Sequence, residues 1–361
     1  MADMDPATLT TPWRRNPAET LPALSRWVEH TMGAGARVED LGEPGNGMSS
    51  ETVLFTVVMP DGTRDRLVAR LAPMPDVYPV FQTYDLDLQR RCMDLVRERT
   101  TAPAPVCRHL ETDSKWLGTP FLVMERVDGE AAPDVPPYVF GGWIMDATPE
   151  QRDALLTRSV EVITQVHTIT PTNADLSFIT GPDPAASALT AQLDGQRAYY
   201  EWAREGVTYP LIERTFDWLV ANQPADRETV LNWGDSRIGN MLYRDFEPVA
   251  VLDWEMATVG PREVDVAWMV FLHRFFQDLA VRFEMPGLPE FMTPEVVCGI
   301  YEDLTGYAPE NLAWYEVFGA LRFAIVSVRT STRGMAYGQM ERPDDPDDLS
   351  MFRSLLDGMI A

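Results

Sequence analysis

Three side chains in the second half of the chain have the types and spacing for phosphoryl-transfer chemistry. Asn240 follows Asp235 by five residues, and Asp253 comes after two short apolar runs. Carboxylate and amide oxygens are ligands that Mg²⁺ accepts, and a carboxylate can orient a hydroxyl toward a phosphoryl group. The pattern predicts that Asp235 positions a hydroxyl and that Asn240 and Asp253 hold Mg²⁺.

A β-hairpin is the element that must bring Asn240 and Asp253 together. Residues 241–243 and 249–252 are apolar, and the polar segment between them contains Asp245 and Pro248. Two apolar runs around such a segment favour an antiparallel hairpin. Because Asn240 and Asp253 are about equally far from the turn, folding the hairpin places both at the same end.

The segments 232–240 and 251–255 together resemble the aminoglycoside phosphotransferase and choline kinase-like family of small-molecule kinases, most closely its acyl-CoA-dehydrogenase-associated actinobacterial branch. The resemblance implies an α+β, protein-kinase-like two-lobed fold, with ATP and Mg²⁺ as cofactors. That family usually has His-Gly-Asp in the loop, and here Trp233 replaces the His. Trp233 either fills the same pocket, with its N–H bonded to a backbone acceptor, or marks a site that has lost catalysis.

Two further residues near the loop have roles that the resemblance implies. Arg237 is a candidate catalytic residue that contacts phosphate or stabilises Asp235, and a structural role is its alternative. Asp265 begins a predicted helix at 264–276, and in the resembling family this Asp braces the catalytic loop through backbone hydrogen bonds. We expect Asp265 to support the loop and not to react.

A glycine-rich segment near residue 45 is a candidate phosphate-binding loop. It precedes two predicted strands, 52–59 and 66–71, which are joined by an Asp61-Gly62 turn. Glycine allows close backbone approach, and exposed N–H groups can meet phosphate oxygens; a plain surface loop is the alternative. The expected nucleotide-binding residues here are Gly45, Gly47, Ser49 and Ser50.

The other expected nucleotide contacts follow from the resemblance. Arg70 takes the place of the strand cation that binds phosphates, and Arg suits phosphate because its planar fork binds two oxygens. Gln89 occupies the position where kinase-like folds have the Glu that pairs with this cation, so an ion pair would be replaced by a hydrogen bond. The interlobe segment is expected to bind adenine through the backbone of Met124, Glu125 and Val127.

The order of predicted elements gives two domains. Residues 1–127 form a small β-rich nucleotide-binding lobe with a leading helix at 21–32, and residues 128–361 form a larger, mainly helical lobe for catalysis and substrate binding. Capping signals at Thr148 and Ser187 begin two of its helices. The remaining predicted helices are 84–99, 211–222 and 349–359, and a buried strand is predicted at 120–125.

The amino-acid composition limits the kinds of partner that the protein is expected to bind. The formal net charge of −25 over 361 residues would repel a nucleic acid backbone or an anionic membrane. The three cysteines show neither a metal-ligand pattern nor a disulfide framework, and the N-terminal segment has no apolar signal region. We therefore expect a cytoplasmic protein that binds neither nucleic acid nor membrane; its oligomeric state is not predicted.

The acceptor is the open question. An aminoglycoside agrees with the acidic composition, whereas a hydroxyacyl thioester agrees with the acyl-CoA-associated branch. Carboxylates in the acceptor pocket would favour the first, and basic and apolar groups the second. A nucleotide-binding protein without catalysis is a second class. A carboxylate metal-dependent hydrolase is a third, which leaves the glycine segment and Arg70 unexplained.

Overall fold

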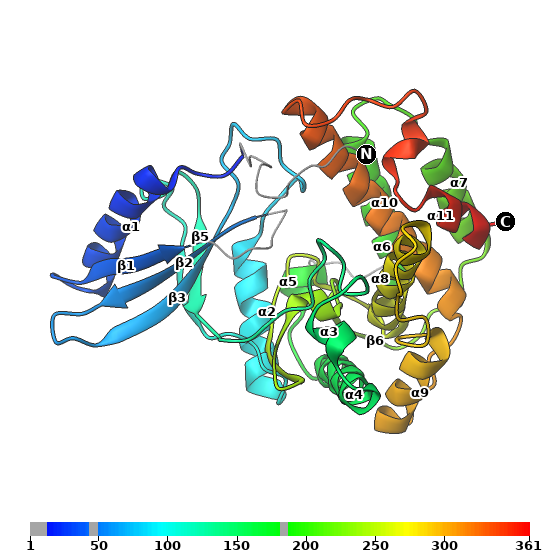
Figure 1. Ribbon diagram of the computed structural model, residues 1–361, viewed down its shortest axis with the longest axis horizontal. Helices are drawn as coiled ribbons and strands as arrows, with labels where there is room; N and C mark the ends of the chain where they lie inside the picture. The colour runs from blue at the N-terminus through cyan, green and yellow to red at the C-terminus, as the bar shows by residue number, and fades with distance from the viewer. Residues whose placement is uncertain (1–12, 43–49, 181–186) are drawn as a thin grey trace. The chain divides into compact units, whose positions relative to one another are not determined.

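The computed structural model describes residues 13–42, 50–180 and 187–361 (Figure 1). The chain divides into two compact units, which are described separately here. The first unit consists of Met1–Leu86, Val106–Arg126 and Thr332–Glu341. The second unit consists of Asp87–Pro105, Val127–Ser331 and Arg342–Ala361.

The first unit is built on an antiparallel five-stranded sheet with the order β1-β2-β3-β5-β4. Its strands are β1 (Arg37–Gly42), β2 (Glu51–Val58), β3 (Arg64–Leu71), β4 (Cys107–Glu111) and β5 (Phe121–Glu125). The Asp61-Gly62 turn joins β2 to β3 as predicted, with Gly62 at φ 88°. Alternation along β3 buries Leu67, Ala69 and Leu71, so Arg70 lies on the opposite face of the sheet.

One helix, α1 (Pro17–Met32), covers the buried face of this sheet (Figure 1). It begins four residues before the predicted start, because Asn16 caps it by accepting from the Ala18 N–H. Trp27 and Leu24 are fully buried against strand residues such as Phe121. Trp27 also donates through Nε1 to Glu111 at 3.0 Å, which satisfies the only polar atom of its ring system.

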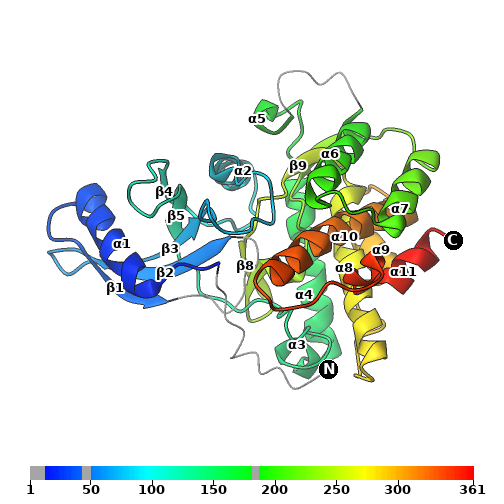
Figure 2. The same cartoon turned by 90° about the horizontal axis from the view of Figure 1, so that it is seen from above.

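The second unit is mainly helical (Figure 2). Its helices include α2 (Leu86–Arg99), α3 (Trp143–Asp146), α4 (Pro149–Val166), α5 (Ser177–Thr180), α6 (Ala188–Ala203), α7 (Pro210–Ala221), α8 (Glu263–Arg282), α9 (Pro294–Thr305), α10 (Leu312–Ala336) and α11 (Arg353–Met359). The first residue of α2 and the last residues of α10 belong to the first unit. The predicted caps are present: Thr148 and Gln151 form a capping box, and Ser187 caps α6. The terminal helix begins at 353, four residues after the predicted start.

Two small ladders in the second unit position the loop between them. β6 (Thr229–Asn232) pairs with β9 (Thr258–Pro261), and β7 (Met241–Arg244) pairs with β8 (Glu247–Val251). The β7–β8 pair is the predicted hairpin. Its turn is Asp245-Phe246, both at positive φ, so Pro248 lies within β8 and not in the turn as expected. The loop at 233–240 runs from the end of β6 to the start of β7.

Candidate active site

Asp235 is held in a defined orientation by two donors. Its Oδ1 accepts a hydrogen bond from Trp268 Nε1 at 2.7 Å and from Arg237 Nε at 3.2 Å. Within the described residues no group donates to its Oδ2, and the side chain keeps 14% exposure. One carboxylate oxygen is therefore fixed by the protein, and the other is available to accept a hydrogen bond from a bound hydroxyl.

The loop that carries Asp235 is braced by Asp265. This fully buried carboxylate, in the first turn of α8, accepts from the backbone N–H of Trp233 at 2.7 Å and of Gly234 at 2.8 Å. His167 lies 3.0 Å from the same carboxylate, and its other ring nitrogen lies 2.8 Å from the Tyr301 hydroxyl. The expected bracing role of Asp265 agrees with these contacts. His167 is therefore part of the hydrogen-bonded support of the loop.

The structure agrees with the first interpretation of Trp233, in which the ring fills a buried pocket and its N–H bonds to a backbone acceptor. Its ring is fully buried, and Nε1 donates to the backbone oxygens of Leu252 at 2.9 Å and Asp253 at 3.2 Å. The indole therefore links the loop to the end of the β7–β8 hairpin. A Trp in this position is compatible with an intact loop.

Gly234 is required because the backbone of Met256 passes very close to it. It has φ +90°, and a Cβ added there would lie 1.9 Å from the Met256 carbonyl oxygen. We expect Gly234→Ala to lower the free energy of unfolding by about 3 kcal/mol or more, because the backbone itself must shift. Urea unfolding checks this. Gly195→Ala in α6, where nothing lies within 4 Å, is the matched control and should be neutral or stabilising; equal losses in both variants would contradict the account.

The end of the hairpin brings Asn240 and Asp253 together as predicted. The Leu252 N–H donates to the Asn240 carbonyl at 2.8 Å, and Asn240 Nδ2 donates to the Asp235 carbonyl at 3.1 Å. Because the amide nitrogen is committed, the amide oxygen is the atom left for another partner. Asp253 adopts φ 60°, a conformation that non-glycine residues rarely take.

This donor set fits a magnesium ion that is also bound by other oxygens. In the described part of the chain no three His, Cys, Asp or Glu side chains converge on a metal position. Mg²⁺ is commonly held by only one or two carboxylates together with waters and substrate phosphates. One carboxylate and one amide oxygen therefore match a nucleotide-associated ion better than a closed structural metal site.

Arg237 lies between two carboxylates. It contacts Asp235 through Nε and Asp134 Oδ2 through Nη1 at 2.5 Å. Burial alone would lower the pKa of Arg237, but the charges of Asp235, Asp134 and Asp253 raise it above its ordinary value. Arg237 therefore stays charged and keeps the carboxylates of the site together. Of its two predicted roles, support of Asp235 is the one with a contact in the structure.

The expected phosphate-binding residues of the first unit are only partly described. Gly45, Gly47 and Ser49 lie outside the described residues, whereas Ser50 immediately precedes β2. Arg70 lies on β3 opposite Thr52 of β2 and Leu122 of β5, on the face away from α1. Its position on the returning strand is therefore as expected.

The remaining expected nucleotide contacts fall in different units. Gln89 is on α2 in the second unit and is buried, at 2% exposure. Met124 and Glu125 end β5 in the first unit, and Val127 begins the next segment of the second. The Glu125 N–H donates to Val106 at 2.9 Å.

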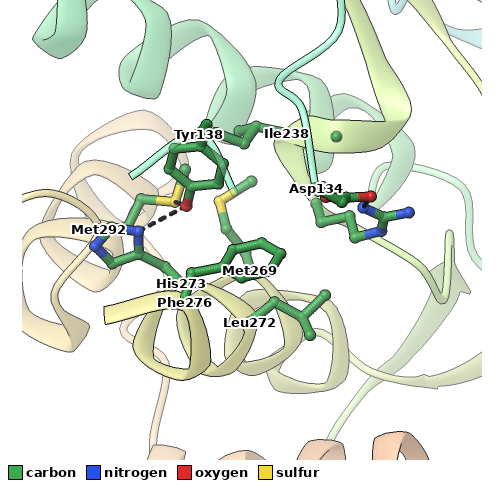
Figure 3. A pocket seen from close by; sticks show the side chains of 10 residues that line it. Asp134, Tyr138, Ile238, Met269, Leu272, His273, Phe276 and Met292 are labelled. Carbon is green, nitrogen blue, oxygen red and sulfur yellow. Dashed lines mark hydrogen bonds and ion pairs between the residues drawn. The ribbon is translucent and has the colours of Figure 1, made fainter. Parts of the chain in front are cut away.

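A small pocket lies beside the loop in the second unit (Figure 3). Asp134 is at one end and the Tyr138–His273 pair at the other, while Met269 and Leu272 of α8 lie between them. Ile238, Gly239, Phe276, Met292 and Arg237 complete the lining. The pocket is thus mostly apolar, and its single acidic residue is already paired with Arg237.

The Tyr138–His273 pair has one defined protonation pattern. His273 Nε2 lies 3.1 Å from the Leu288 carbonyl, which can only accept, so Nε2 carries the proton. Nδ1 therefore accepts from the Tyr138 hydroxyl at 2.6 Å. Burial lowers the pKa of His273 to about 4, so the ring is neutral at physiological pH.

The lowered pKa of His273 predicts an acid-dependent loss of stability. Below about pH 6.5 the unfolded chain binds a proton at this residue that the folded chain does not bind until about pH 4. Stability should therefore fall as the pH drops through this window, by about 2 kcal/mol between pH 7.5 and pH 5. Urea unfolding at pH 7.5 and pH 5 measures this loss of stability. His273→Gln should remove the loss, whereas the exposed His30→Gln should retain it. Unchanged acid sensitivity in His273→Gln would contradict the assignment.

Sequence reasoning missed Trp268 as the partner of Asp235 and Asp134 as the partner of Arg237. Asp134 lies about a hundred residues before the loop, in an irregular segment without a motif. No signal in a single sequence connects the two.

A unit built on a five-stranded sheet and a mainly helical unit agree with the predicted α+β, protein-kinase-like fold. The model of the phosphotransferase enzyme family matches residues 41–289. The chain therefore belongs to the phosphotransferase enzyme family, and the predicted family and α+β fold are confirmed.

Known proteins agree with this assignment. Acyl-CoA dehydrogenase family member 10 of Mus musculus is 27% identical over 263 residues, 72% of this chain and 23% of that protein. Acyl-CoA dehydrogenase family member 11 of Homo sapiens is 29% identical over 159 residues, 43% of this chain and 19% of that protein. The chain thus spans about a fifth to a quarter of the length of these curated relatives.

A solved structure shares the fold. A thermostable mutant of aminoglycoside phosphotransferase APH(4)-Ia, in a ternary complex with ADP and hygromycin B, has a TM-score of 0.56 at 15% identity. The match covers 94% of this chain and 98% of that one. Among the described residues, no helix is both long and apolar enough to cross a membrane.

Proposed function

We propose that this chain transfers the γ-phosphoryl group of ATP to a hydroxyl of a small molecule, with Asp235 as the residue that orients the hydroxyl. The observation that carries the proposal is the fixed carboxylate: Trp268 and Arg237 hold Oδ1, and Oδ2 is left to accept the hydroxyl proton. Positioning of this kind supplies much of the catalysis in phosphoryl transfer.

Asn240 and Asp253 would hold Mg²⁺, which neutralises charge on the phosphate oxygens when bound. The chain's own contribution is to fix the two ligands at the end of one hairpin. Arg70 is the candidate for the α- and β-phosphates, with the segment containing Gly45, Gly47, Ser49 and Ser50 as the candidate phosphate loop. These nucleotide-binding roles rest on the family membership and on the position of β3.

The magnesium assignment predicts a specific loss in Asp253→Asn. Replacing a carboxylate by an amide removes one charge from a two-ligand site, so we expect the Mg²⁺ concentration at half-maximal activity to rise roughly 10-fold or more. Steady-state rates over a Mg²⁺ titration measure this. Exposed Asp245→Asn, in the turn of the same hairpin, should behave like the wild type. An unchanged Mg²⁺ dependence in Asp253→Asn would show that the ligand is assigned wrongly.

For the acceptor, we favour a hydroxyacyl thioester over an aminoglycoside. Aminoglycosides are polycations, and a site for them should present several carboxylates. The side chains around the small cavity beside the loop are instead mostly apolar, with a neutral Tyr–His pair and one carboxylate that Arg237 already neutralises. The sequence relatives are acyl-CoA dehydrogenase family members, which points in the same direction.

Acceptor-stimulated ADP release from Mg-ATP tests the proposal. The panel contains hydroxybutyryl- and hydroxydecanoyl-coenzyme A, with kanamycin and hygromycin B as the competing class. We expect the hydroxyacyl compounds to accelerate ADP release and the two antibiotics to leave it unchanged. Stimulation by the antibiotics alone would reverse the choice of acceptor, and ATP binding without stimulation by any compound would favour a non-catalytic nucleotide-binding protein.

A further inference from the structure

Arg322 of α10 is a buried cation to which the proposed mechanism gives no role so far. Its side chain is almost fully enclosed, at 4% exposure, and within the described residues its Nη1 has no hydrogen-bond partner. Burying a charged group costs free energy unless its partners compensate for the lost water. A buried arginine with an unused donor therefore calls for a reason other than stability.

One contact of Arg322 fixes the backbone immediately before Asp235. Arg322 Nη2 donates to the Gly234 carbonyl at 2.7 Å. The N–H of Gly234 donates in turn to Asp265 Oδ1 at 2.8 Å. Gly234 has φ +90°, in a part of conformational space that glycine enters freely. Because charged groups hold both its N–H and its carbonyl, the direction in which the chain enters Asp235 is defined.

A second contact of Arg322 fixes the ring that holds the Asp235 carboxylate. The guanidinium carbon lies 4.5 Å from the centre of the Trp268 ring, within the range of a cation–π interaction. Trp268 Nε1 donates to Asp235 Oδ1 at 2.7 Å. A cation over the ring draws electron density from the indole, so we expect it to strengthen this hydrogen bond as well as to hold the ring in place.

We propose that Arg322 is a positioning residue for phosphoryl transfer, which orients Asp235 through the Gly234 carbonyl on one side and the Trp268 indole on the other. The inference rests on the proposed function. It adds to that function a residue from a distant helix that acts on both the main chain and the side chain of Asp235. Arg322 should therefore affect the rate of transfer and leave the binding of ATP and of the acceptor unchanged.

Arg329 provides a matched control on the same helix, about two turns further along. It is also buried, at 2% exposure, and its guanidinium carbon lies 3.8 Å from the centre of the Trp202 ring. It forms an ion pair with Glu205 at 2.7 Å. Comparing Arg322→Lys with Arg329→Lys therefore separates an effect on Asp235 from the general effect of replacing a buried arginine that stacks on a tryptophan.

The test measures kcat, both KM values and the melting temperature, with whichever acceptor of the hydroxyacyl and aminoglycoside panel accelerates ADP release most. Lysine keeps the charge and can donate to the Gly234 carbonyl, but it lacks the planar group that covers the indole. We expect Arg322→Lys to lower kcat roughly 10-fold and Arg322→Met, which also loses the charge and the donor, roughly 100-fold. The KM values should not change, and Arg329→Lys should keep the wild-type kcat.

A double variant shows whether the effect passes through Asp235. If Arg322 acts by orienting this carboxylate, adding Arg322→Lys to Asp235→Asn should change the remaining kcat very little. A merely structural role would instead lower kcat by the same factor in both backgrounds, because the loss would not depend on the carboxylate.

Equal kcat in Arg322→Lys and Arg329→Lys would overturn the inference and leave the proposed function standing. The same factor of loss with Asp235 and with Asn at that position would overturn it as well. If Arg322→Met does not fold, the two lysine variants still decide, and if Arg322→Lys alone fails to fold, Arg322 is structural and the inference is wrong. If no acceptor stimulates the wild type, the proposed function fails and the inference fails with it.

Discussion

Asp235→Asn should lower the acceptor-dependent kcat by about 10²- to 10⁴-fold, the usual contribution of a positioned base. The amide oxygen of Asn can still accept from Trp268 and Arg237, as Oδ1 of Asp235 does at 2.7 and 3.2 Å. The variant should therefore fold and bind ATP. What it loses is the second carboxylate oxygen that would take the hydroxyl proton.

Three measurements separate this effect from misfolding: kcat, the affinity for ATP and the melting temperature. Asp245→Asn, an exposed acid in the hairpin turn at φ 52°, is the matched control, because Asn tolerates that backbone conformation. Only kcat should change, and only in Asp235→Asn. A variant with wild-type kcat would remove Asp235 from the mechanism.

The second large effect is expected at Asp265. Its fully buried carboxylate accepts the N–H groups of Trp233 and Gly234, at 2.7 and 2.8 Å, and contacts His167. In Asp265→Asn one of these donors would face an amide NH₂ instead of an oxygen. Removing one member of a buried charged network typically costs 3–5 kcal/mol, so we expect a loss of about 3 kcal/mol or more in the free energy of unfolding.

Arg322 should increase the loss of stability in Asp265→Asn. It is buried, donates to the Gly234 carbonyl at 2.7 Å and lies 4.5 Å from the centre of the Trp268 ring. Burial lowers its pKa to about 10, while the charges of Asp265 and Asp235 oppose that fall. Without the charge of Asp265 this guanidinium would be less well compensated.

Urea unfolding measures the loss, and Asp278→Asn provides the control. Asp278 is on the same helix and forms an ion pair with Arg282 near the surface, where such pairs contribute about 1 kcal/mol at most. If Asp265→Asn lowered the free energy of unfolding by as little as Asp278→Asn, the loop would not depend on the hydrogen bonds to Asp265.

The elements that local sequence determines were predicted well. Asp61-Gly62 gives the β2–β3 turn, and Thr148 and Ser187 cap α4 and α6, because these residues act through contacts within a few positions. The long helix α10, which contains Trp314 and Tyr315, was not predicted. Both are core residues, and Trp314 Nε1 donates to Leu219 of α7. Burial on most sides removes the clear periodicity that reveals surface helices.

In the candidate site, too, the residues close together in the sequence were predicted and the distant ones were not. Asp235, Asn240 and Asp253 are within twenty residues, so one predicted hairpin was enough to place two of them together. Asp134 and His167 reach the site from distant segments, and their pairings with Arg237 and Asp265 depend on tertiary packing. Spacing along the chain carries no trace of such contacts. The roles of Arg70, Gln89, Met124, Glu125 and Val127 in nucleotide binding stay predictions.

We propose above all that this chain moves a phosphoryl group from ATP to a hydroxyl under the control of Asp235. The most direct measurement follows ATP labelled in its γ-phosphoryl group, with Mg²⁺ and hydroxybutyryl-coenzyme A, and identifies the labelled product by mass spectrometry. We expect label on the acceptor hydroxyl with the wild type and almost none with Asp235→Asn. Label found only in inorganic phosphate, or transferred equally by both proteins, would contradict it.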